Sequence, residues 1–141
     1  MTWAEHTNER LRESGYRPGG ARAAVIDALA RESCCVSAQE IHDVVRQRRP
    51  GIGVASVYRA LETLTALGLV HRFDLRSSGA RYEPAEPSGD HHHHLVCGDC
   101  GKVEAFSDDW LERAIHTVSE ASAFRIDEHD VVLRGRCEAC A

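Results

Sequence analysis

Two Cys-x-x-Cys pairs constrain the fold of this chain more than any other feature of its sequence. Cys97 and Cys100 form the first pair, and Cys137 and Cys140 form the second pair at the end of the chain. Four cysteine thiolates at this spacing can close a tetrahedral structural zinc site. The sequence therefore predicts that the two pairs come together around one zinc ion.

Other uses of the six cysteines fit the sequence less well. Disulfides form in secreted proteins, but the N-terminal segment is polar, carries both charge signs and is unlike a secretory signal. A thioredoxin-like redox motif needs a βαβ pattern, and none follows either pair. Cys34 and Cys35 are adjacent in sequence and too close for an ordinary disulfide, so we expect free thiols or metal ligands there.

The charges are distributed unevenly along the 141 residues. Residues 1–83 contain 12 arginines and 10 acidic residues, a net charge of +2, whereas residues 84–141 contain 5 basic and 12 acidic residues, a net charge of −7. Only the first half can approach nucleic acid without general repulsion. No run of about 18 apolar residues is present, so we expect no membrane partner and a cytoplasmic location.

The stretch EPAEPSGD divides the chain, because its prolines and glycine interrupt any regular element. Before it, apolar periodicity predicts helices over 2–14, 22–31 and 54–68, and Ser37 is predicted to cap another helix whose apolar face holds Ile41, Val44 and Val45. The segments LVHRFD and ARYEPA then predict a hairpin. After the boundary, the patterns indicate strands and one helix. We therefore predict an α+β protein with a winged helix-turn-helix domain (1–84), a hinge (85–90) and a small α/β domain (91–141).

The outward face of the helix over 54–68 favours DNA binding over a purely structural helical domain. Small, hydroxylic, aromatic and cationic side chains near its start can meet thymine methyls, phosphate oxygens and base edges. A backbone phosphate can also be held at the start of the second helix. A core position is the alternative for the tyrosine of this set. The predicted DNA contacts are Arg17, Arg22, Ala55, Ser56, Tyr58 and Arg59.

Four consecutive histidines, His91 to His94, lead directly into the apolar segment LVC. In an extended strand, successive side chains point to opposite faces. His91 and His93 would then face one way, and His92 and His94 the other. The run can therefore serve two metal centres, whereas the alternative is a solvated loop of histidines.

Over almost its whole length, the sequence resembles the ferric uptake regulator superfamily of metal-dependent repressors. The resemblance is carried by GYRPGGARAAVIDAL, VSAQEIHDVV, GVASVYRALETLTALGLVHRFD, RYE, HHHHLVCGDCGKVEAFSD and CEAC. It implies a winged-helix domain followed by an α/β dimerisation domain, a homodimer, and a palindromic double-stranded DNA operator. It also implies two metal sites at or near the hinge, in addition to the four-cysteine zinc.

The same resemblance implies the ligands of the two further metal sites. The site of the dimerisation domain would use His91, His93, Glu112 and His129. The regulatory hinge site would use Cys35, Glu83, His92 and His94. His71 is an alternative hinge ligand, and His116 is a weaker candidate because a solvated helix histidine explains it better.

The sensed metal is predicted from the types of ligand. Iron-type members of the family read His-His-His-Asp-His where this chain has Asp90 and four histidines, so His93 stands in place of an aspartate. Together with a Cys35 thiolate, this makes the sites richer in nitrogen and sulfur and favours zinc over ferrous iron. Zinc-type members can carry a hinge cysteine after the hairpin, and this chain has none there. Ferrous iron, nickel and peroxide sensing therefore stay open as alternatives.

The expected mechanism is repression with metal as corepressor. Metal at the hinge would tie the two domains together and favour the arrangement that fits DNA. A zinc hydrolase that uses His91, His93 and Glu112 is the competing enzyme class, but no separate general base is apparent. A zinc-ribbon interaction module without DNA would leave VASVYR unexplained.

Overall fold

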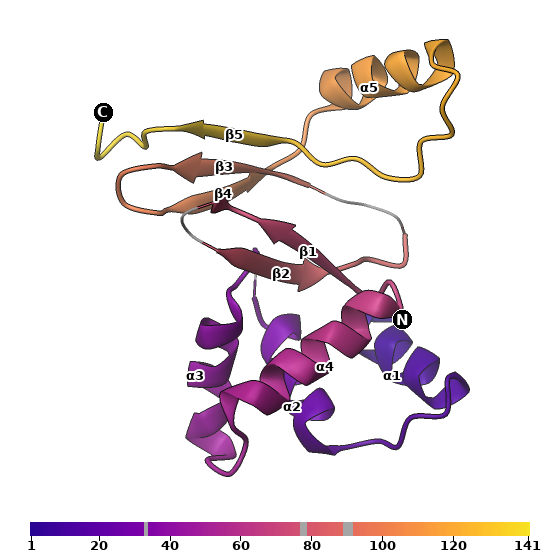
Figure 1. Ribbon diagram of the computed structural model, residues 1–141, viewed down its shortest axis with the longest axis vertical. Coiled ribbons are helices and arrows are strands. Elements are labelled where there is room, and N and C mark those ends of the chain that lie inside the picture. Colours follow the sequence, from indigo (N-terminus) through magenta and orange to yellow (C-terminus); the bar gives the residue numbers. More distant parts are fainter. Residues whose placement is uncertain (33, 77–78, 89–91) are drawn as a thin grey trace. The chain divides into compact units, whose positions relative to one another are not determined.

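The computed structural model describes residues 1–32, 34–76, 79–88 and 92–141. The chain divides into two compact units, Met1–Asp90 and His91–Ala141 (Figure 1). The architecture is α+β, with helices preceding a hairpin in the first unit and a small sheet with one helix in the second. None of the helices in these ranges is long and apolar enough to cross a membrane.

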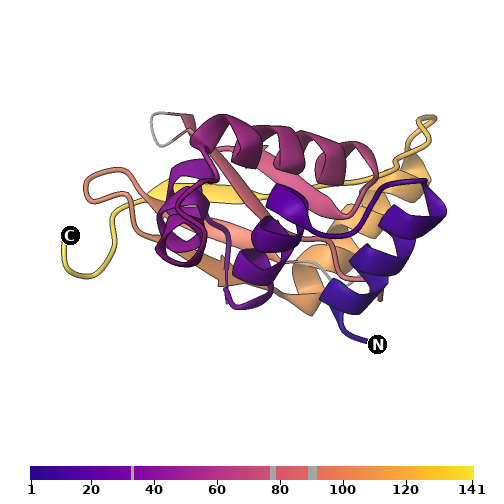
Figure 2. The ribbon, with the colours of Figure 1, turned by 90° about the horizontal axis from the view of Figure 1, so that it is seen from below.

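Four helices and a hairpin build the N-terminal unit. The helices are α1 (Trp3–Glu13), α2 (Gly20–Ala30), α3 (Ala38–Arg48) and α4 (Val54–Ala66). Helix α2 contacts the other three, which surround it in Figure 2. The apolar side chains on the facing stripes of α2 and α4 form most of the core: Val25, Ile26, Leu29, Val57, Leu61 and Leu64 are each at most 1% exposed.

The ends of α3 and α4 follow from local chemistry. The Ser37 hydroxyl accepts a hydrogen bond from the Glu40 amide at 3.1 Å, which satisfies one of the free N–H groups at the start of α3. The Glu40 carboxylate is paired with Arg81 at 2.7 Å, so it ties α3 to the hairpin. At the other end of α4, Gly68 adopts a φ of +71°, a conformation that favours glycine.

The prediction of a buried Val44 was wrong, because this side chain is 38% exposed. Helix α3 instead buries Ala38, Ile41 and Val45, which recur every three or four residues along one stripe. Val44 lies just outside that stripe. The buried stripe of α3 is therefore narrower than the run of apolar residues indicates.

The hairpin consists of β1 (Val70–Asp74) and β2 (Ala80–Pro84), which pair antiparallel with Val70 opposite Pro84. An isolated bridge between Val36 and Tyr82 adds the segment before α3 to the other edge of β2. The Trp3 indole donates a hydrogen bond to the Leu69 carbonyl at 2.8 Å and so joins α1 to the start of the hairpin.

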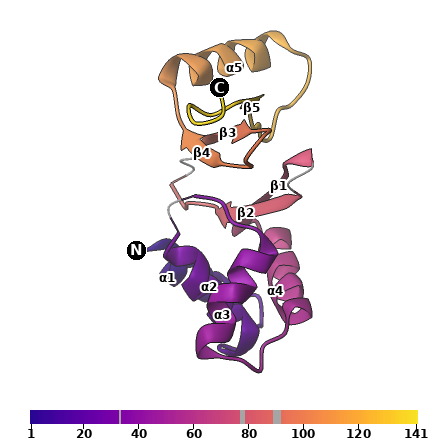
Figure 3. The same ribbon diagram turned by 90° about the vertical axis from the view of Figure 1, so that its left-hand side faces the viewer.

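The C-terminal unit contains β3 (His93–Cys97), β4 (Val103–Phe106), α5 (Asp109–Ala121) and β5 (Val132–Gly135). The sheet has the order β4-β3-β5, with β3 antiparallel to β4 and parallel to β5 (Figure 3). No residue of α5, which is described in full, is buried. Trp110, Val118 and Phe124 are each at least 70% exposed, so this unit leaves a large apolar surface uncovered.

Candidate metal centres and nucleic-acid interface

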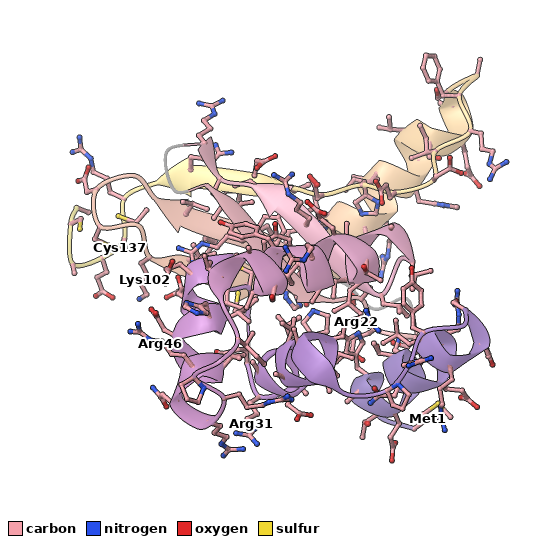
Figure 4. All side chains as sticks on the ribbon, turned by 60° about the horizontal axis from the view of Figure 1, so that its bottom comes forward. Met1, Arg22, Arg31, Arg46, Lys102 and Cys137 are labelled. Atoms are coloured by element: carbon pink, nitrogen blue, oxygen red, sulfur yellow. The ribbon has the colours of Figure 1, made fainter. Side chains whose placement is uncertain are left out.

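The parallel pairing of β3 with β5 brings the two Cys-x-x-Cys turns together. Cys97 ends β3 opposite Gly135 at the end of β5, and the Gly98 amide donates to the Gly135 carbonyl at 2.8 Å. The sulfur atoms of the predicted zinc ligands then lie within 4.8 Å of one another. Figure 4 shows Cys137 and Lys102 on neighbouring turns of this unit. The pairs thus come together as the sequence predicts.

The four-sulfur cluster fits a zinc ion. Tetrahedral Zn–S bonds of about 2.3 Å place two ligand sulfurs about 3.8 Å apart, and the sulfurs of Cys100 and Cys137 are separated by 3.7 Å. A hydrogen bond from the Cys100 amide is the main cause that lowers the pKa of Cys97 to about 6. The neighbouring Cys137 side chain raises the pKa of Cys140 to about 12. The Cys97 sulfur is therefore available as a thiolate, and zinc has to displace the proton of Cys140.

A second cluster joins the start of β3, the first turn of α5 and the loop before β5. His93 Nε2 lies 2.5 Å from one carboxylate oxygen of Glu112, and His129 Nε2 lies 2.8 Å from the other. The donor atoms of these side chains lie within 4.8 Å of one another, which suits a single ion. Two imidazoles and one carboxylate form the ligand set of many zinc sites. His91, the fourth predicted ligand, lies outside the described residues.

The Val131 amide determines the proton position on His93. This backbone N–H donates to His93 Nδ1 at 3.1 Å, so Nδ1 acts as an acceptor. In a neutral ring the proton then sits on Nε2 and points to Glu112. A metal ion at Nε2 would move that proton to Nδ1, where it would oppose the Val131 N–H. Metal binding by His93 through Nε2 therefore requires the Val131 hydrogen bond to break.

The predicted hinge ligands are divided between the two units. In the N-terminal unit, the sulfur within 4.8 Å of a Glu83 carboxylate oxygen is that of Cys34, whereas the thiol ligand predicted from the sequence is Cys35. In the C-terminal unit, the rings of His92 and His94 lie side by side, with centroids 5.3 Å apart. Since His93 faces Glu112 and His94 lies close to His92, the alternation predicted for this run holds over its described residues.

Cys35 has the surroundings of an unreactive thiol. Its side chain is buried and its pKa is raised to about 12, mainly by that burial and then by the adjacent Cys34. The positive charge of Arg81 acts in the opposite direction and lowers the pKa of Cys35. The group is therefore a protonated thiol at neutral pH, and only a strongly thiophilic ion displaces its proton.

The two remaining histidine candidates are on the surface. His71 is exposed on β1, where it pairs in register with Glu83 on β2. The side chain of His116 is 73% exposed and contacts Glu120 at 3.1 Å on the same helix. An ordinary surface contact with Glu120 accounts for His116 without a metal.

The face of α4 predicted to read DNA is open. Tyr58 is 47% exposed, which excludes the core alternative for this side chain. Arg59 donates to the Ser56 hydroxyl at 3.0 Å, so both project from the first turns of the helix. Ala55 is exposed beside them. Gly53 caps α4 without a side-chain hydrogen bond, which leaves N–H groups at the helix start for an acceptor such as phosphate.

Arginines also collect where α1 leads into α2. Arg22, labelled in Figure 4, donates to the Arg17 carbonyl at 3.2 Å, and its guanidinium lies 4.8 Å from the centre of the Tyr16 ring. These residues and Arg12 line a surface cavity of about 300 Å³. The cationic groups at the start of α2 are thus held in place by local contacts.

Two features of these sites have no signal in the sequence. The role of Val131 depends on its backbone amide, which any residue except proline provides. The approach of Cys34 to Glu83 depends on the bridge between Val36 and Tyr82, which joins segments distant in sequence. Only the presence of a thiol in this region was predictable.

Known proteins match this chain over most of its length. Residues 13–134 match the ferric uptake regulator family. The ferric uptake regulation protein of Bacillus subtilis is 32% identical, over 96% of this chain and 93% of its own, and that of Cupriavidus metallidurans is 36% identical, over 90% and 88%. The structure of the Helicobacter pylori ferric uptake regulator, which has three functional metal binding sites, superimposes with a TM-score of 0.84 at 30% identity, over 97% of this chain and 93% of that one.

Replacement of Cys97 by serine tests the four-cysteine site. We expect Cys97→Ser and Cys137→Ser each to lower the zinc content by one ion per chain and to unfold or monomerise the C-terminal unit, because metal binding and folding are coupled at such sites. Metal analysis and sedimentation measure the two effects. Ser107→Ala, an exposed position before α5, is the control. A dimer with one zinc fewer and an unchanged melting temperature would contradict the structural role.

Proposed function

This chain belongs to the ferric uptake regulator family of metal-responsive transcriptional regulators, and we propose that it is a repressor that senses zinc. The observation that carries this choice of metal is the contact of His93 with Glu112 and His129. Two imidazoles and a carboxylate are ligands of many zinc sites and also of ferrous sites, so the preference for zinc comes from the extra imidazole in place of an oxygen ligand. The histidine at a position where iron-type members have aspartate thus changes the preference of the site.

The hinge site is proposed to be the regulatory one. Its ligands would be Glu83, His92, His94 and a thiolate of the Cys34–Cys35 segment, with Cys35 as the residue that the family resemblance indicates and His71 as an alternative. Donors from both units can be satisfied together only when the units adopt a particular arrangement. Metal therefore binds that arrangement more tightly and increases its population.

The remaining sites have separate proposed roles. The four cysteines would hold a permanent structural zinc, as the separation of their sulfurs supports. The His93 site would adjust the metal response, because its filling competes with the Val131 hydrogen bond. Together with the hinge, this gives three metal sites, the number found in the Helicobacter pylori protein.

The DNA-bound form is proposed to be a homodimer on a palindromic operator in the cytoplasm. The apolar surface around Trp110, Val118 and Phe124 supports self-association, because monomeric proteins rarely expose patches of this kind. In a two-fold dimer, each α4 would enter the major groove of one half-site. Arg17 and Arg22 would contact the backbone, and Ala55, Ser56, Tyr58 and Arg59 the groove. Members of this family are transcriptional regulators, so the alternatives of a zinc hydrolase and of a zinc-ribbon module are excluded.

The choice of zinc is tested by DNA affinity at buffered free concentrations of Zn²⁺, Fe²⁺, Ni²⁺ and Mn²⁺. The DNA is an operator selected by the protein from a random pool. We expect Zn²⁺ to activate binding at the lowest free concentration, because its ligands here are nitrogen and sulfur. Salt is held constant, since phosphate contacts make the affinity salt-dependent. Each activating concentration is divided by the free concentration at which that ion is available. A lower value for Fe²⁺ than for Zn²⁺ would contradict the proposal.

The DNA-reading face is tested with Tyr58→Ala and Arg59→Ala. Each variant should weaken binding to the selected operator by about 10-fold to 100-fold, the range expected for the loss of one base contact. Metal content and dimerisation should not change, because both side chains are on the surface. Arg125→Ala removes a charge from an exposed site in the other unit and is the control. If both α4 variants kept the unaltered affinity for the operator, DNA would have to bind at a surface other than this face of α4.

Paired histidine variants test the division of the metal sites. Replacing His92 and His94 by alanine should remove almost all metal activation of DNA binding, because the proposed tie between units is lost. Replacing His91 and His93 should shift the metal concentration of half-activation and leave activation possible. The zinc ion of the four-cysteine site should stay bound in both double variants, and metal analysis measures this. Equal loss of activation in the two would mean that the histidines act as one cluster.

A further inference from the structure

Cys34 and Cys35 present two sulfur atoms at one place in the N-terminal unit. The sulfurs are 3.7 Å apart, and both residues are free thiols. Cys34 is half-buried and Cys35 is buried. Disulfide bonds are about 2.05 Å long, so the two sulfurs lie well beyond bonding distance of each other.

The backbone around this pair is fixed by the bridge to β2. The Val36 amide donates to the Tyr82 carbonyl at 2.9 Å, and the Tyr82 amide donates back at 2.8 Å. These bonds hold the residue after Cys35 against β2. The next residue, Ser37, is the N-cap of α3. Glu83 follows Tyr82 directly, and one of its carboxylate oxygens lies within 4.8 Å of the Cys34 sulfur. The dithiol therefore sits on anchored backbone at the point where β2 and α3 meet.

The separation of the two sulfurs matches one edge of a zinc coordination tetrahedron. Two sulfurs bound to the same zinc ion lie about 3.8 Å apart. The Cys100 and Cys137 sulfurs in the four-cysteine cluster show the same 3.7 Å separation. Both thiols of the pair can thus reach one ion without a change in their spacing.

We propose that Cys34 and Cys35 bind the regulatory ion together, as a bidentate dithiol with Glu83 as oxygen ligand. This deepens the proposed function, since it concerns the same hinge site and gives it two sulfur ligands from the N-terminal unit instead of one. Two thiolates and a carboxylate supply three ligands and more than offset the charge of a divalent ion. Fewer ligands are then needed from the histidines of the other unit.

The chemical consequence is selection for thiophilic ions that accept tetrahedral geometry. Thiolate ligands favour Zn²⁺ and its thiophilic analogues over Fe²⁺ and Mn²⁺, which prefer oxygen and more ligands. A second thiolate strengthens this preference. The hinge would therefore discriminate between metals mainly through the N-terminal unit.

Co²⁺ titration of the full-length protein tests the dithiol. Co²⁺ is added after the four-cysteine site is filled with Zn²⁺, and the zinc content is measured to show that this ion stays. The sulfur-to-cobalt charge-transfer band then reports the number of thiolates at the second site. We expect Cys34→Ser and Cys35→Ser each to lose about half of the band and the double variant to lose all of it, because each sulfur contributes one Co–S bond.

Two further measurements keep the result independent of folding defects. X-ray absorption at the cobalt edge counts the sulfur ligands in the unaltered protein, and two are expected. Cys35→Ala, which does not bury a hydroxyl, should give the same band as Cys35→Ser.

A single sulfur in the unaltered protein, or a band that depends on only one of the two cysteines, would overturn the dithiol. Metal-activated DNA binding could still be lost in the His92/His94 double variant, and the proposed regulatory hinge would then stand with one thiolate. Conversely, the two cysteine variants could lose the cobalt–sulfur band while metal activation of DNA binding stays unchanged. The dithiol would then stand as a metal-binding site, and the hinge would be excluded as the regulatory element.

Discussion

The parallel pairing of β3 with β5 is the interaction on which the C-terminal unit depends. Parallel neighbours need a long crossover connection, and here α5 lies within it. The pairing brings Cys97 to the second Cys-x-x-Cys turn at one end of the strands. At the other end, the crossover returns Glu112 and His129 to His93. One ladder of backbone hydrogen bonds thus assembles two metal-binding clusters that share no ligand.

The same strand explains why neighbouring histidines have different partners. Side chains alternate across a strand, so His93 and His94 leave β3 on opposite faces. His93 contacts Glu112, while His94 lies near His92. A shift of register by one residue would exchange these faces and disrupt both sets. The Cys97 anchor at the end of the strand opposes such a shift, so a zinc ion bound by the four cysteines would also preserve the identity of the two histidine sets.

The features that could be predicted from the sequence are those with a fixed local spacing. The Cys-x-x-Cys pairs, the Ser37 cap and the outward position of Tyr58 each depend on residues close together in the chain. Val44 was assigned wrongly because apolar periodicity does not define the width of a buried stripe. The proton position on His93 and the contact between Cys34 and Glu83 depend on backbone groups brought together by distant strands. No pattern of side chains along the sequence encodes those two contacts.

The proposed metal tie between the units would have a consequence for repression itself. If metal raises the affinity for DNA by some factor, DNA must raise the affinity for metal by the same factor. A repressor bound to its operator would therefore hold the regulatory ion at free concentrations where the unbound protein has already lost it, and a stronger operator would keep more of the repressor bound. Genes with strong operators would stay repressed over a wider range of metal depletion than genes with weak ones. The affinity of the operator, and not only the ligands of the hinge, would thus set the metal concentration at which each gene responds.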